Sequence, residues 1–117
     1  MGVEKFEDLK VWRISINLSI RIYNSLKDSK EFGLKDQLQR ASVSIPSNIA
    51  EGFDRKTNKE YIYFLHIAQG SCAELRTQLY LVKELGIIKD IESDDLIETT
   101  RKISAMIHRL IQSRQKF

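Results

Sequence analysis

Lysine and arginine are the residues of this sequence best suited to a binding function, because their side chains bind phosphate groups. They occupy two stretches that contain no acidic residue, at positions 9–27 and 99–117. A phosphate backbone is the natural partner of a surface formed by such stretches. A basic face that only favours solubility is the alternative interpretation. The tentative nucleic-acid-binding positions are Lys10, Arg13, Arg21, Arg101, Lys102, Arg109 and Lys116.

A second group of polar residues recurs at spacings of three or four positions between residues 40 and 55. This spacing places its members on one side of a helix. We favour a polar network at a contact between subunits, and a solvated surface or a ligand site are the alternatives. The members of this polar stripe are Arg40, Ser44, Asn48, Glu51 and Arg55.

Candidates for catalysis or metal binding are sparse. His66 and His108 have no second ligand at helical spacing on their C-terminal side, so a metal site is not indicated. Cys72 is the only cysteine, and we expect it to act as a small buried hydrophobe. The glycines are dispersed and form no phosphate loop. The sequence therefore predicts a protein that is not an enzyme, with no cofactor and no metal.

The elements that must position these side chains are expected to be helices. The chain has 117 residues with one proline and five glycines, which suits a single domain, residues 1–117, of long helices. A lone cysteine suits a reducing cytoplasm. No apolar run approaches the roughly 20 residues that span a bilayer, and no secretory signal opens the chain. We therefore expect a cytoplasmic protein without a membrane contact.

Local signals divide the chain into four helices, at residues 8–28, 34–53, 57–85 and 93–114. Thr57 and Glu60 form a capping box before the third helix, and Gly86 follows its end. Ser93 is the expected N-cap of the fourth helix. The short connections favour an all-α, antiparallel up-down-up-down four-helix bundle, in which the first and last helices are neighbours.

The third helix shows the clearest packing pattern. Apolar residues recur at alternating spacings of four and three, which is the seam of a left-handed bundle. Small residues between Ala68 and Ala73 predict a close approach of a neighbouring helix. The seam consists of Tyr61, Leu65, Ala68, Cys72, Leu75, Leu79 and Val82.

The first helix contains an ambiguous segment, because residues 14–22 alternate between apolar and polar as a strand would. Leu9, Trp12 and Leu26 extend the apolar set around a helical wheel, and no partner strand is evident, so we predict a helix. Its polar arc covers only about 80° at about 100° per residue. The wide apolar remainder predicts a second buried face against another subunit; a deeply packed helix in a monomer is the alternative.

Three motifs carry a resemblance to a known family: FEDLKVW at residues 6–12, GLKDQLQRA at 33–41 and SIPSNIAEG at 44–52. With a last helix rich in leucine and isoleucine, they resemble the 23S rRNA-intervening sequence protein family. That resemblance implies antiparallel four-helix bundles assembled into a homopentameric ring. A related branch, the accessory proteins of diversity-generating retroelements, is similar in fold, basic, and works with a reverse transcriptase and nucleic acid. The resemblance implies no catalytic residues.

Two functional hypotheses follow. The first is a non-enzymatic oligomer that binds RNA or DNA through a basic face with little sequence specificity. The alternative is a protein–protein interaction scaffold, or accessory protein, with no direct nucleic-acid contact. No aromatic residue is interleaved with the basic positions of the last helix, so we do not expect base stacking there.

Overall fold

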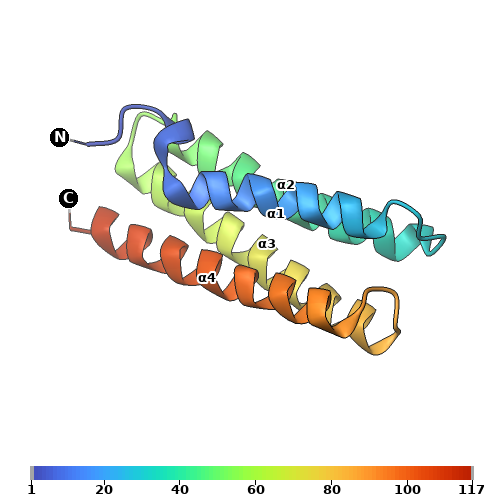
Figure 1. The fold of residues 1–117 in the computed structure, drawn as a ribbon. Helices are drawn as coiled ribbons and strands as arrows, with labels where there is room; N and C mark the ends of the chain where they lie inside the picture. Colours follow the sequence, from blue (N-terminus) through green and yellow to red (C-terminus); the bar gives the residue numbers. More distant parts are fainter. Residues whose placement is uncertain (1, 117) are drawn as a thin grey trace.

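Four long helices pack side by side to form the molecule (Figure 1). The computed structural model describes residues 2–116, which contain no strand, so the all-α prediction is confirmed. A short 3-10 helix, η1, spans Phe6–Asp8. The four α-helices are α1 (Lys10–Leu26), α2 (Phe32–Phe53), α3 (Asn58–Glu84) and α4 (Asp90–Arg114).

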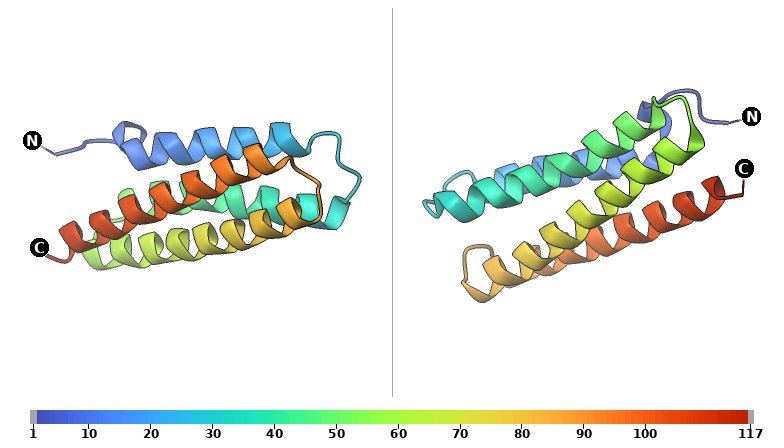
Figure 2. Two further views of the ribbon diagram at one scale, coloured as in Figure 1. Left: turned by 60° about the horizontal axis from the view of Figure 1, so that its bottom comes forward. Right: turned by 180° about the vertical axis from the view of Figure 1, so that it is seen from behind.

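The helices lie along one axis, and the molecule measures 45 × 20 × 20 Å. Each helix contacts the next one in the chain, and α1 also contacts α4. The start of α1, the α2–α3 turn and the end of α4 lie together at one end of the molecule (Figures 1 and 2). We call this the termini end; the α1–α2 and α3–α4 connections lie at the other end.

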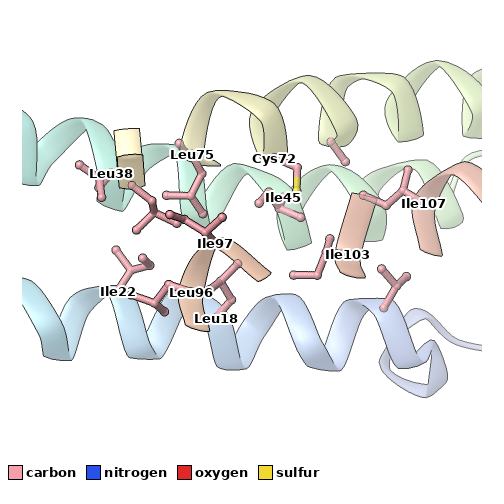
Figure 3. Packing of buried hydrophobic residues seen from close by; sticks show 14 of the residues in the cluster. Leu18, Ile22, Leu38, Ile45, Cys72, Leu75, Leu96, Ile97, Ile103 and Ile107 are labelled. Carbon is pink, nitrogen blue, oxygen red and sulfur yellow. The ribbon is translucent and has the colours of Figure 1, made fainter. Parts of the chain in front are cut away.

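All four helices contribute to one apolar core (Figure 3). The predicted seam of α3 is confirmed, because each of its residues is buried. Large aliphatic side chains from the other helices meet this seam, which is the interdigitated packing expected of a bundle. Labelled examples in Figure 3 are Leu18, Ile22, Leu38, Ile45, Cys72, Leu75, Leu96, Ile97, Ile103 and Ile107.

The ambiguous segment at residues 14–22 is helical, as predicted. Its buried members, Ser15, Leu18, Ser19 and Ile22, are spaced by three and four rather than by two. Ser19 and Ser42 are buried and share a hydrogen bond of 3.1 Å between their hydroxyl groups. These short side chains allow α1 and α2 to approach each other closely while their polar atoms remain paired.

Both ends of α3 follow the predicted signals. The Thr57 hydroxyl accepts a hydrogen bond from the Glu60 backbone N–H at 3.1 Å. Gly86 has a φ of 71°, which is the left-handed conformation that glycine adopts most readily. The N–H groups of Gly86 and Ile87 donate to the carbonyls of Lys83 and Val82. These two bonds form a Schellman motif, which satisfies carbonyls at the end of the helix.

The start of α4 differs from the prediction. The helix begins at Asp90, three residues before Ser93. Ser93 is buried within the first turns, and its hydroxyl donates to the Ile88 carbonyl instead of capping the helix. Asp90 and Glu92 occupy the first turn, where acidic side chains interact favourably with the helix dipole.

α2 and α3 approach each other closely at Gly52. A Cβ atom built on Gly52 would lie 2.7 Å from Cβ of Phe64, too close for any side chain to fit without movement. Farther along the same contact, the hydroxyls of Ser44 and Ser71 lie 2.7 Å apart. Gly70 has no atom within 4 Å of its would-be Cβ, so it is not part of the close approach predicted for residues 68–73.

Candidate nucleic-acid interface

Charges are segregated along α4. Its acidic residues all lie between Asp90 and Glu98, and its basic residues all lie from Arg101 onward. The basic half ends at the termini end of the molecule (Figure 1). Lys102, Arg109 and Lys116 are exposed and form no ion pair with any residue from 2 to 116. These three residues, spaced by seven, are called the α4 basic stripe, although Lys116 lies two residues beyond the end of the helix.

The basic residues predicted on the first helix divide into two groups. Lys10 and Arg13 are exposed at the start of α1, close to the termini end, and the Arg13 guanidinium donates to the Glu7 carbonyl. Arg21 is half-buried, pairs with Asp95 of α4 and donates to Thr99. Arg21 therefore links α1 to α4, and its charge is balanced within the chain.

Arg101 lies apart from the α4 basic stripe. Its guanidinium pairs with Glu98 and donates to the Tyr80 hydroxyl on α3, so it faces the α3 side of α4. Tyr80 is 43% exposed. Folding thus places an aromatic ring beside a predicted basic residue, although the two are 21 positions apart. Spacing along the sequence carried no signal for this pair.

The polar stripe of α2 divides into three local groups. Arg40 pairs with Asp36 at 2.8 Å, and Arg55 pairs with Glu51 at 2.7 Å. The two partners in each pair are four residues apart, and all four side chains are exposed. Between them, the Asn48 amide donates to the Ser44 hydroxyl, which also bonds Ser71 of α3. Among residues 2–116, hydrogen bonds and ion pairs therefore do not link the five stripe residues into one network.

An apolar groove of about 320 Å³ lies between α1 and α2. Ile20 on one wall is 53% exposed, and Val43 on the other is 42% exposed. The groove contains part of the wide apolar arc predicted on α1, and Pro46 of α2 contributes to its lining. Sequence reasoning identified the α1 side but missed the α2 side. The residues that we call the α1–α2 groove are Phe6, Trp12, Ile16, Ile20, Val43 and Pro46.

Two buried groups with raised pKa values lie inside the bundle. Burial raises the pKa of the Cys72 thiol above its ordinary 9.0, while nearby Arg76 opposes the shift. The thiol donates to the Thr100 carbonyl at 3.1 Å. Burial also raises the pKa of Tyr61 from 10.0 to about 12. Cys72 is fully buried, as the sequence predicted, and its thiol is held in the protonated, unreactive form.

These shifts predict that the protein loses stability at alkaline pH. Above pH 9 the unfolded chain loses its thiol proton, and above pH 10 its phenol protons, whereas the folded chain retains those of Cys72 and Tyr61. The unfolded state then binds fewer protons, so the free energy of unfolding falls as pH rises. Urea unfolding at a series of pH values measures the slope.

The Tyr61→Phe variant should show a flatter slope between pH 10 and 12. Tyr63→Phe, which alters a tyrosine that is 62% exposed, is the matched control. If Tyr61→Phe leaves the slope unchanged, the raised pKa of Tyr61 does not contribute to the loss of stability at alkaline pH.

Two other features, a metal site and a membrane-spanning helix, are absent from residues 2–116. Within residues 2–116, no group of three or more histidine, cysteine, aspartate and glutamate side chains is arranged to hold a metal ion. Among the same residues, no helix has the length and apolar character needed to cross a membrane.

These features define a small all-α bundle protein whose last helix exposes a basic stripe. The chain belongs to the 23S rRNA-intervening sequence protein family, whose model matches residues 7–109. Its structure is similar to the crystal structure of a protein of unknown function from the S23 ribosomal protein family of Bacteroides thetaiotaomicron VPI-5482. The TM-score is 0.82, with 25% identity over 86% of this chain and 97% of that chain. Among curated proteins, none matches the chain.

Proposed function

We propose that this protein is a non-enzymatic, cytoplasmic nucleic-acid-binding protein. Its up-down-up-down bundles assemble into a homopentameric ring, and the ring binds RNA or DNA through phosphate contacts with little sequence preference. The observation that carries the proposal is the α4 basic stripe, which is exposed and has no ion-pair partner among residues 2–116. Unpaired cations release the counterions of a phosphate backbone when they bind it, which supplies affinity without sequence readout.

The α1–α2 groove supports the assembly. Contiguous apolar surface on a small protein commonly marks an interaction site. Ile20 and Val43 remain largely exposed in the single chain, and a neighbouring subunit would remove them from water. Repetition of the basic stripe around a ring adds avidity, because each further contact forms at a high effective concentration.

A protein–protein interaction scaffold is the second candidate, and a separate observation favours it. The outer side of α3 and its C-cap expose two pairs of large apolar residues, and the members of each pair are four positions apart. A partner helix could bind along such a row through its own apolar face. The exposed residues of this row are Tyr63, Ile67, Leu81 and Leu85.

Charge reversal tests the nucleic-acid proposal. The double variant Lys102→Glu/Arg109→Glu should weaken binding to a duplex or a single strand by about tenfold or more at low salt. The dependence of log affinity on log salt should become shallower by about 0.9 for each duplex phosphate that the variant no longer neutralises. Fluorescence anisotropy at several salt concentrations measures both quantities.

Lys27→Glu/Lys30→Glu is the matched control, because it makes the same change in net charge at the other end of the molecule. This control should retain the affinity and salt dependence of the wild type. An equal loss of affinity in both double variants would show that only net charge matters. No binding by the wild type at low salt would favour the scaffold.

A further inference from the structure

Two exposed apolar surfaces lie on neighbouring sides of the bundle. The first is the α1–α2 groove. The second is a pair of α3 residues, Tyr63 and Ile67, which are 62% and 36% exposed. They are four positions apart, so their side chains form one ridge on the outer side of the helix. We call this pair the α3 ridge. A hollow on one side and a ridge on another are the two halves that a contact between copies requires.

The α3 ridge and the α1–α2 groove lie at the same level along the bundle. Ile67 lies between two α3 residues that contact α2, three positions after Phe64 and four before Ser71. It is therefore on the edge of α3 nearest to α2. The α2 positions that Phe64 and Ser71 contact, 52 and 44, span nearly the same interval as the α2 positions that line the groove, which run from 43 to 50. A second copy lying parallel to the first needs no shift along the bundle to place its ridge in the groove.

The exposed charges beside the groove are basic. Lys10 and Arg13 are the exposed charged residues of α1, and Arg13 directly follows Trp12 of the groove wall. The exposed charges of α2 are held in ion pairs within the chain, so they add little net charge. The surface around the groove is therefore positive.

The exposed charges of α3 are mainly acidic. Apart from Lys59, they belong to Glu60, Glu74 and Glu84, none of which forms an ion pair with any residue from 2 to 116. Glu60 is three positions before Tyr63, so it lies beside the ridge. A ridge docked in a groove sets this acidic surface against a basic one. Two grooves or two ridges face to face would instead oppose like charges, which disfavours the pairing.

We propose that the α3 ridge of one copy docks in the α1–α2 groove of a second copy. The inference rests on the assembly in the proposed function and identifies the second half of its contact. Because the two halves are different surfaces, the contact is head-to-tail: each copy offers a groove to one neighbour and a ridge to another. The two surfaces lie on neighbouring and not on opposite sides, so successive copies turn, as a closed ring requires. The contact removes Ile20, Val43 and the ridge from water.

Two variants that each damage one half test the contact. Ile20→Glu damages the groove and leaves the ridge, whereas Ile67→Glu damages the ridge and leaves the groove. Each variant alone should have a mass of about 13.6 kDa by light scattering after size exclusion. Mixed in equal amounts at about 100 μM, where a contact of micromolar Kd is occupied, they should form a particle of twice that mass. The intact ridge of one variant then fills the intact groove of the other, and the damaged surfaces stop further growth.

Ile91→Glu is the matched control, because it makes the same change at a position that is 87% exposed and belongs to neither surface. It should assemble as the wild type does. Circular dichroism checks that each variant is helical. Tyr63→Glu provides a second test of the ridge if Ile67→Glu does not fold, since Tyr63 is the more exposed of the two residues.

Three results would overturn the proposed contact. Assembly of Ile67→Glu to the wild-type mass would show that the ridge is not part of the contact and is free for a different protein. A mixture no heavier than its components would show that the contact is not head-to-tail. A monomeric wild type would exclude the proposed assembly as well. Nucleic-acid binding is measured separately, so an assembled wild type that binds no nucleic acid would leave this contact in place while the proposed binding function fails.

Discussion

Replacing Gly52 with alanine is expected to lower the free energy of unfolding by about 1–3 kcal/mol, the usual cost of overpacking a core. The new methyl group would lie 2.7 Å from Cβ of Phe64 and 3.2 Å from the Tyr61 carbonyl oxygen. Neither atom is at the flexible end of a side chain, so α2 and α3 must move apart. Urea unfolding followed by circular dichroism measures the change.

Gly70→Ala is the matched control, because Gly70 is also inside a helix but has no atom within 4 Å of the added carbon. Alanine is favoured over glycine within helices by roughly 0.5–1 kcal/mol, so this variant should be more stable than the wild type. The two substitutions should therefore have opposite signs. A gain in stability from both would show that helix propensity, and not the close approach at Gly52, decides the outcome.

Ile20→Glu is expected to convert the assembly into single chains. Ile20 lies in the α1–α2 groove and is 53% exposed in the single chain. A subunit that covered the groove would bury the new carboxylate without a partner, at a cost of several kcal/mol. Light scattering after size exclusion should report a mass several times 13.6 kDa for the wild type and about 13.6 kDa for the variant.

Ile91→Glu makes the same chemical change at a position that is 87% exposed and outside the groove, so it should assemble as the wild type does. A wild-type chain that is monomeric at micromolar concentration would exclude the assembly. A multimeric Ile20→Glu variant would show that the groove is not the contact between subunits.

Most of the fold could be predicted because its signals are local. The α3 seam follows from spacings of three and four, and the ends of α3 follow from Thr57 and Gly86 alone. The first helix was harder, because the alternation at residues 14–22 satisfies a strand pattern as well as a helix. Leu26 and Trp12 settled it, since both lie outside the alternating segment and extend the apolar side of a helix.

The start of α4 was misplaced because its deciding contact is tertiary. Ser93 is a good N-cap by residue type, but burial against the core turns its hydroxyl to the Ile88 carbonyl. Within residues 68–73 the close approach lies at Ser71, whose hydroxyl is 2.7 Å from that of Ser44 on α2, and not at Gly70. Gly52 has Phe64 beside it, and Gly70 has open space.

The candidate interface was less accessible to sequence reasoning because its charges are paired across helices. Arg21 belongs to an acid-free stretch of sequence, yet folding places it against Asp95, 74 positions away. By contrast, the spacing of Lys102 and Arg109 follows from one helix, and both positions are exposed as that spacing predicts. Lys116 continues the spacing of seven but lies two residues beyond the end of α4.

The segregation of charge along α4 also gives this helix a dipole of side-chain charges. A helix of 25 residues is about 37 Å long, and whole side-chain charges near its two ends outweigh the half-charges of its peptide dipole. The negative pole lies at the start of α4 and the positive pole at the termini end. If the proposed function holds, the field of a polyanion attracts the basic end of this helix, so encounters would begin with the termini end facing the nucleic acid.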